Sequence, residues 1–126
     1  MKAPRTVPTD LELEILKVIW QRGQATVREV YNDLAAQRKI AYTTVLTMMG
    51  ILEHKGHLKK ERGERAYLYR PAQSEVQVKK RMVKEFVDRV FDGSTQPLLV
   101  HLIGERPIGP DEIHEIDELL KKQRQK

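Results

Sequence analysis

The chain has 126 residues, of which 40% are hydrophobic and 33% charged, enough for one folded domain or for a small domain with an appendage. It contains no cysteine, which excludes disulfides, thiolate catalysis and cysteine-based zinc or iron–sulfur sites. Residues 1–72 hold 13 Lys and Arg against 8 Asp and Glu, whereas residues 73–126 hold 10 of each, so the whole net charge of +5 lies in the first part. This distribution indicates a polyanionic partner for that part, although a need for solubility explains it equally well.

The first ten residues, MKAPRTVPTD, lack the apolar stretch of a signal peptide, and apolar runs such as residues 98–100 are too short to cross a bilayer. We therefore expect a cytoplasmic protein without membrane insertion. The sequence has no glycine-rich phosphate loop and no nucleophile elbow, and the pair His54 and His57 lacks an evident third metal ligand. We expect no enzymatic activity, no catalytic residues, no cofactor and no metal site.

Two amphipathic helices are expected at the start of the chain. Each has a broad apolar stripe and begins with a capping box, in which a Thr is followed three residues later by a Glu. Their bounds and caps are residues 9–22 with Thr9 and Glu12, and residue 26 to about residue 38 with Thr26 and Glu29.

A third helix is expected over residues 42–55, ending at Gly56. At roughly 100° per residue, one face is apolar and the opposite face is small, polar and uncharged. A solvated face more often carries Lys and Glu, so this face is typical of a helix that enters a DNA groove; an ordinary amphipathic helix in a bundle is the alternative. The apolar face has Val45, Met48, Met49 and Leu52, the opposite face has Thr43, Thr47, Gly50 and His54, and the predicted DNA contacts are Tyr42, Thr43, Thr44 and Thr47.

A basic two-stranded hairpin is expected next, with strands over residues 58–62 and 65–70 joined by a type II′ turn at Gly63 and Glu64. Lys60, Arg62 and Arg65 are the predicted DNA contacts of this hairpin, with Lys59 and Arg70 as further candidates for phosphate binding and Arg5 as a contact from an N-terminal arm. A solvated charged hairpin is the alternative, favoured by Glu61 and Glu64. A helix followed directly by a basic hairpin is the layout of a winged helix-turn-helix DNA-binding domain.

Beyond Pro71 the pattern predicts helices only, over residues 74–91, 97–103 and 110–122. So small a segment buries too little apolar area to be stable alone, and pairing of two copies would supply the missing core. Packing of these helices back on the first domain is the alternative. The predicted dimerisation residues are Val83, Phe86, Val90, Leu98, Leu99, Leu102, Ile113, Ile116 and Leu120.

The run from Asp10 to Pro71 resembles the penicillinase-repressor (BlaI/MecI) family, which also includes copper-responsive CopY-type repressors. The matching segments are LELEILKVIW, TVREVYNDLA, AYTTVLTMM, KGHL and YLYRP, and a looser likeness continues through the C-terminal helices. The resemblance implies a homodimeric winged-helix repressor that binds a palindromic operator and dimerises through its C-terminal helices. Gly50 and Ile51 stand where relatives often carry polar or basic residues.

The resemblance also bears on induction. In the antibiotic-resistance members, a membrane-bound metalloprotease sensor triggers cleavage of the repressor, which implies such a sensor or another inducing protease as a partner. The matching stretch, LLVHLIGERP, places the bond near His101 and Leu102, where the family pattern is Asn-Phe. CopY-type members carry a C-terminal cysteine metal hook, so this cysteine-free chain is not expected to sense copper.

We therefore predict a mainly α-helical protein with a small β-hairpin, in which residues 1–72 form a winged-helix DNA-binding domain and residues 73–126 a helical dimerisation region. The predicted function is sequence-specific repression by a homodimer on a palindromic operator, with half-sites about 10 base pairs apart or a multiple of that spacing. The main alternative is a winged-helix adaptor that binds protein in a regulatory complex. A noncatalytic enzyme subunit is a further alternative, as is a ligand-sensing repressor, for which the sequence shows no clear pocket.

Overall fold

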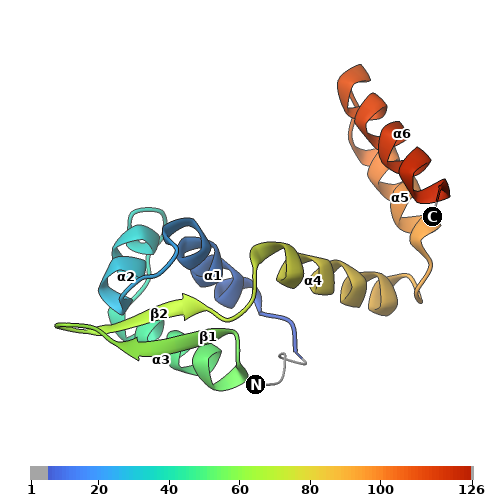
Figure 1. The fold of residues 1–126 in the computed structure, drawn as a ribbon. Helices are drawn as coiled ribbons and strands as arrows, with labels where there is room; N and C mark the ends of the chain where they lie inside the picture. The colour runs from blue at the N-terminus through green and yellow to red at the C-terminus, as the bar shows by residue number, and fades with distance from the viewer. Residues whose placement is uncertain (1–5, 126) are drawn as a thin grey trace. The chain divides into compact units, whose positions relative to one another are not determined.

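Helices and one antiparallel hairpin make up the fold in a computed structural model, which describes residues 6–125 (Figure 1). This confirms the predicted fold class. The chain divides into two compact units between Glu85 and Phe86, within the fourth helix, and the predicted functional division at residue 72 stays a prediction. The elements are α1 (Asp10–Arg22), α2 (Val27–Ala35), α3 (Tyr42–Lys55), β1 (Leu58–Arg62), β2 (Tyr67–Pro71), α4 (Glu75–Val90), α5 (Thr95–Glu105) and α6 (Pro110–Arg124).

Both predicted capping boxes are present and set where α1 and α2 begin. The Glu12 N–H donates to the Thr9 hydroxyl over 3.3 Å, and the Thr9 N–H donates to the Glu12 carboxylate over 3.0 Å. Thr26 and Glu29 form the same pair of bonds over 3.1 and 2.9 Å. Two N–H groups that the helix itself leaves unpaired are thus satisfied at each start.

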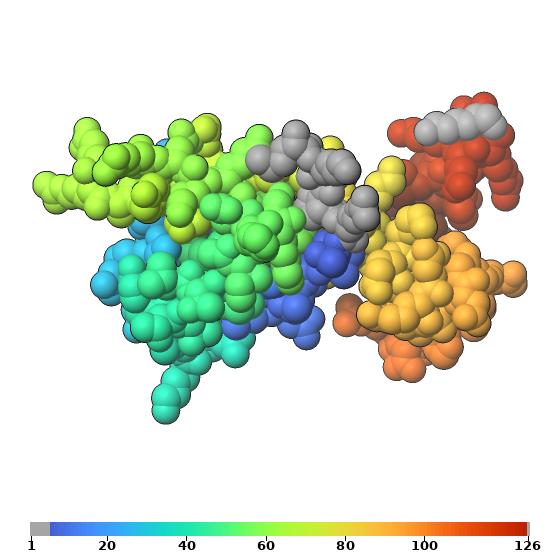
Figure 2. Space-filling view, turned by 90° about the horizontal axis from the view of Figure 1, so that it is seen from below, coloured from blue at the N-terminus to red at the C-terminus, as the bar shows by residue number. Residues whose placement is uncertain are grey.

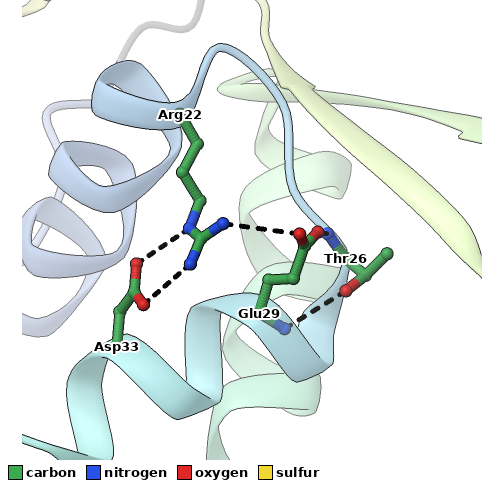
Figure 3. A network of polar contacts seen from close by, with 4 residues as sticks. All are labelled: Arg22, Thr26, Glu29 and Asp33. Carbon is green, nitrogen blue, oxygen red and sulfur yellow. Dashed lines mark hydrogen bonds and ion pairs between the residues drawn. The ribbon is translucent and has the colours of Figure 1, made fainter.

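Arg22, at the end of α1, ties that helix to α2 (Figure 3). Its guanidinium donates two hydrogen bonds of 2.8 Å to the Asp33 carboxylate and lies 3.4 Å from Glu29. The guanidinium beside Asp33 holds the pKa of that carboxyl below its ordinary value. Because these groups are largely exposed, the network contributes more to the relative orientation of α1 and α2 than to stability.

The core of the first unit lies where the apolar stripes of α1, α2 and α3 meet the base of the hairpin. The predicted inner face of α3 is confirmed: Val45, Met49 and Leu52 are buried, and Met48 is half-buried at the edge. Burial of one face of α3 fixes which face points outward. The other buried core residues are Ile15, Leu16, Ile19, Ala25, Val27, Val30, Leu34, Leu58 and Tyr69.

The hairpin differs from the prediction at its tip. β1 and β2 pair in a register that runs from Leu58 opposite Pro71 to Arg62 opposite Tyr67, so the loop has four residues, 63–66. The predicted two-residue type II′ turn is therefore wrong, and Gly63 does not adopt the left-handed φ that such a turn requires. Gly63 is needed for close approach instead, because a Cβ there would lie 2.5 Å from the Ala66 carbonyl oxygen, to which its N–H donates over 3.0 Å.

An antiparallel bridge that the sequence did not reveal anchors the hairpin base. The Ala25 N–H donates to the Tyr69 carbonyl over 3.0 Å, and the Tyr69 N–H donates back to Ala25 over 2.8 Å. Ala25 lies between α1 and α2, so the bridge joins the hairpin to the first two helices.

The predicted bounds of α2, α5 and α6 are corrected, and α5 ends at Glu105 rather than at residue 103. α2 ends at Ala35 rather than near residue 38, because the N–H groups of Gln37 and Arg38 turn back to the Leu34 carbonyl. α5 begins at Thr95, two residues before Pro97, since proline is tolerated throughout the first helical turn. α6 continues to Arg124. Among the helices within residues 6–125, none is both long and apolar enough to span a membrane.

Replacing Thr26 with Ala should lower the free energy of unfolding by about 1 kcal/mol, because the Glu29 N–H loses its acceptor. Thr43→Ala is the matched control, since Thr43 is exposed and the α3 start has no side-chain cap. Urea denaturation followed by circular dichroism measures both. Equal losses in the two variants would contradict the role given to the cap.

Candidate nucleic-acid interface

The outward face of α3 carries the three predicted threonine contacts in exposed positions, whereas Tyr42 is half-buried against the core. Thr43, Thr44 and Thr47 are exposed, as are Gly50 and His54. The three threonines and Met48 line a hollow of about 250 Å³. In the space-filling view, α3 (turquoise to green) lies on the same side of the first unit as the hairpin (yellow-green) (Figure 2). The two elements therefore present one surface, which we call the α3–hairpin face.

Tyr42, at the start of α3, is held in an aromatic and cationic cluster. Its ring meets the Tyr31 ring edge-on, with centroids 5.6 Å apart, and the Arg28 guanidinium carbon lies 4.4 Å from the Tyr42 centroid. Arg28 is exposed on the first turn of α2. The sequence analysis missed Arg28, although its position two residues after the cap Thr26 and three before Tyr31 was a usable signal.

The hairpin supplies exposed positive charge. Lys60 and Arg62 lie on β1, and Arg65 lies in the loop rather than on the second strand as predicted. The Lys60 ammonium is 4.5 Å from the centroid of the Tyr67 ring, which braces it across the hairpin. Glu61 forms an ion pair with Arg70 on the opposite strand, so this carboxylate is neutralised locally. Arg5, the remaining predicted DNA contact, lies outside the described residues.

A buried polar cluster supports the junction between α3 and β1. The Lys55 ammonium contacts the Glu12 carboxylate over 2.9 Å, and the Glu12 side chain is only 3% exposed. Burial acts to raise the pKa of this carboxyl, but the Thr9 N–H and Lys55 outweigh it, so the pKa lies below its ordinary value. No sequence pattern links Lys55 with Glu12, because 43 positions separate them.

His57, the residue before β1, is buried beside this cluster. Burial lowers the pKa of its imidazole; Glu12 opposes the shift, Lys55 and Arg81 on α4 add to it, and the Thr6 backbone opposes it weakly. His57 is buried whereas His54 is exposed, and within residues 6–125 no three His, Asp or Glu side chains gather as a metal site.

The second unit exposes much of the apolar surface predicted to mediate dimerisation. α5 and α6 contain no buried residue, and residues of both line a groove of about 450 Å³. Leu102 and Ile113, both 54% exposed, line it. Leu98 is half-buried, whereas Phe86, Val90, Leu99, Ile116 and Leu120 are exposed, as is Val83, which lies on α4 in the first unit.

Three helices with a paired hairpin, joined to further helices, define a winged-helix protein. The family model for the penicillinase repressor matches residues 8–122, and the chain belongs to this family of transcriptional repressors, which are not enzymes. The resemblance inferred from the sequence is thereby confirmed.

Two curated relatives and one solved structure illustrate the match. Transcriptional regulator BlaI of Mycobacterium tuberculosis is 35% identical over 105 residues, covering 82% of this chain and 75% of that protein. Methicillin resistance regulatory protein MecI of Mammaliicoccus sciuri is 23% identical over 111 residues, covering 88% and 90%. The solution structure of monomeric Bacillus licheniformis BlaI in complex with the blaP half-operator is 32% identical, covers 60% of this chain and 90% of that one, and has a TM-score of 0.51.

The buried imidazole predicts a pH dependence of stability. Because the pKa of folded His57 is below 6.5, the unfolded chain binds a proton first as the pH falls through about 6.5, and the free energy of unfolding declines below that pH. The stability contributed by Glu12 is lost only at lower pH, below about 4.5.

Urea denaturation between pH 5 and 7 therefore measures the contribution of His57 to the free energy of unfolding separately from that of Glu12, because the ordinary pKa of histidine lies within that range. His57→Gln should make the free energy of unfolding nearly independent of pH in this range. His54→Gln, which changes an exposed side chain, should leave the pH dependence unchanged. A profile that keeps its slope in His57→Gln would contradict the assignment.

Proposed function

We propose that the protein is a homodimeric repressor that binds a palindromic double-stranded operator, with α3 in the major groove and the hairpin on the backbone or in the minor groove. The observation that carries this proposal is the outward face of α3, which is exposed and uncharged beside a cationic hairpin. A helix face that contacts only solvent usually carries charged side chains. The outward face of α3 carries none, although the neighbouring hairpin is rich in them. BlaI in complex with a half-operator, 32% identical over the winged-helix part, supports the same reading.

Within this proposal, the residues divide by what they contact. Thr43, Thr44 and Thr47 meet base edges or nearby phosphates through hydroxyl and methyl groups, and Tyr42 binds a phosphate at the mouth of α3. The cations of the hairpin, Lys60, Arg62 and Arg65, bind phosphates or enter the minor groove. Arg28, held against Tyr42, is a further phosphate contact at the other end of the α3–hairpin face.

Dimerisation follows from the apolar surface of the second unit. Because α5 and α6 contain no buried residue, they form no core of their own, and a second copy is the proposed cover for the groove that they line. A two-fold dimer presents two α3 helices to one duplex and therefore selects a palindrome. The proposed place of action is the cytoplasm.

An inducing protease, such as a membrane metalloprotease sensor, is the proposed means of release. The bond between His101 and Leu102 lies inside α5, and both residues are exposed. Cleavage there requires local opening of the helix and separates α6, with Ile113, Ile116 and Leu120, from the rest of the chain. Loss of these side chains from the dimer would weaken binding to both half-sites together.

DNA retardation at several salt concentrations tests the division of roles, on operator DNA footprinted upstream of the protein's own gene and on random duplexes. Thr47→Ala should lower preference for the operator about fivefold, since one hydrogen bond is worth about 1 kcal/mol. Lys60→Gln should weaken binding to both duplexes and reduce the salt slope by about 1.

Lys121→Gln, in the part of the chain without excess charge, is the matched control for the Lys60 variant. Equal losses on operator and random DNA for Thr47→Ala would contradict the base-reading role. Binding that ignores salt, with no retarded DNA, would favour the protein-adaptor alternative.

The dimer is tested by placing a charge on the α6 stripe. Ile116→Asp should convert the dimer to a monomer, because an unpaired carboxylate would be buried in the interface. Lys122→Asp is the matched control, since Lys122 is exposed on α6 and lies roughly 120° or more around the helix axis from Ile113, Ile116 and Leu120. Sedimentation equilibrium gives the masses, and a dimer that tolerates both changes would refute the interface.

A further inference from the structure

The outward face of α3 carries two exposed apolar side chains beside its threonines. Leu46 is 47% exposed and Ile51 38% exposed. From Tyr42 to Leu52, the sequence YTTVLTMMGIL contains no charged side chain. Exposed leucine and isoleucine are ordinary when scattered, but here they lie on the helix that carries the proposed DNA contacts.

The helix geometry places these two side chains on either flank of the small residues. Leu46 and Ile51 are five positions apart, which separates them by roughly 140° around the axis. Leu46 is one helical turn from Gly50, and Thr47 is one turn from Ile51, so the four residues form two adjacent rows. Gly50 adds no bulk, and a Cβ there would meet no atom within 4 Å beyond its chain neighbours and the local helix backbone. Leu46 and Ile51 therefore flank two small residues, Thr47 and Gly50, over which another molecule can approach the helix closely.

The positive charge around Leu46 and Ile51 indicates which kind of partner binds this apolar surface. Arg28, on α2, packs against Tyr42 at the start of α3, and Lys60 and Arg62 lie on β1, which contacts α3. An apolar strip between cations is complementary to a DNA groove, where phosphates flank the base edges. A protein partner for an apolar patch does not require this flanking charge.

Only one base edge in the major groove carries an apolar group, the C5 methyl of thymine. Leucine and isoleucine side chains have no hydrogen-bond donor or acceptor, so they cannot read the polar edges of guanine, adenine or cytosine. We infer that Leu46 and Ile51 are specificity-determining residues that select thymine methyl groups within each half-site, on either side of Thr47 and Gly50. This inference rests on the proposed function and adds the base preference to it.

The test uses a duplex selected from a random library by the full-length protein. Replacing every thymine of the half-sites with deoxyuridine removes the methyl groups and leaves all hydrogen-bonding edges unchanged. Affinity should fall about fourfold for each contacted methyl, the equilibrium equivalent of one buried CH₂ group. The matched control carries the same number of deoxyuridines in the flanking sequence only, and its affinity should equal that of the thymine duplex.

A double-mutant cycle assigns the effect to the two side chains. Leu46→Ala and Ile51→Ala should weaken binding to the thymine duplex and bind the uracil duplex as the unchanged protein does. Both side chains are exposed and alanine favours a helix, so the variants should fold, which circular dichroism checks.

Two results would overturn the inference while leaving the proposed function standing: equal affinity for the thymine and uracil duplexes, or the same loss in both variants on both duplexes. Failure of the library to yield any sequence preferred over random DNA would instead refute the proposed function, and the inference with it.

Discussion

The burial of one side of α3 is the constraint on which the proposed interface depends. Val45, Met49 and Leu52 pack into the core made with α1, α2 and the hairpin base, so the opposite side must face outward. β1 follows α3 directly in the chain. Its first residue, Leu58, packs into the same core, and the charged residues after it stay outside. One hydrophobic core thus sets the orientation of both α3 and the hairpin in the α3–hairpin face.

Polar contacts then hold this face in place at three points. The bridge between Ala25 and Tyr69 fixes the hairpin base, the ion pair of half-buried Lys55 with buried Glu12 fixes the end of α3, and Arg28 packs on Tyr42 at its start. Each joins segments distant in the sequence. A helix fixed at both ends beside an anchored hairpin loses little conformational freedom on binding, which favours recognition of one defined surface.

The sequence alone predicted the features that depend on residues close together in the chain. Thr9 with Glu12 and Thr26 with Glu29 predicted the helix starts, and the 3.6-residue period predicted the inner face of α3. It failed at the hairpin tip, because a Gly required for close approach to the Ala66 carbonyl reads the same as a Gly required for a left-handed turn. It also missed the partners that only folding brings together, such as Arg28 with Tyr42 and His57 with Arg81.

The chain contains no cysteine, so one introduced thiol reports on one position. Gly50→Cys places that thiol at the centre of the outward face, where the structure has open space. The most direct test measures its rate of alkylation with and without a saturating operator duplex. We predict strong protection at this position and none for Leu119→Cys on α6. Equal alkylation rates for Gly50→Cys in the free and the DNA-bound protein would contradict the account, since α3 would then lie outside the groove.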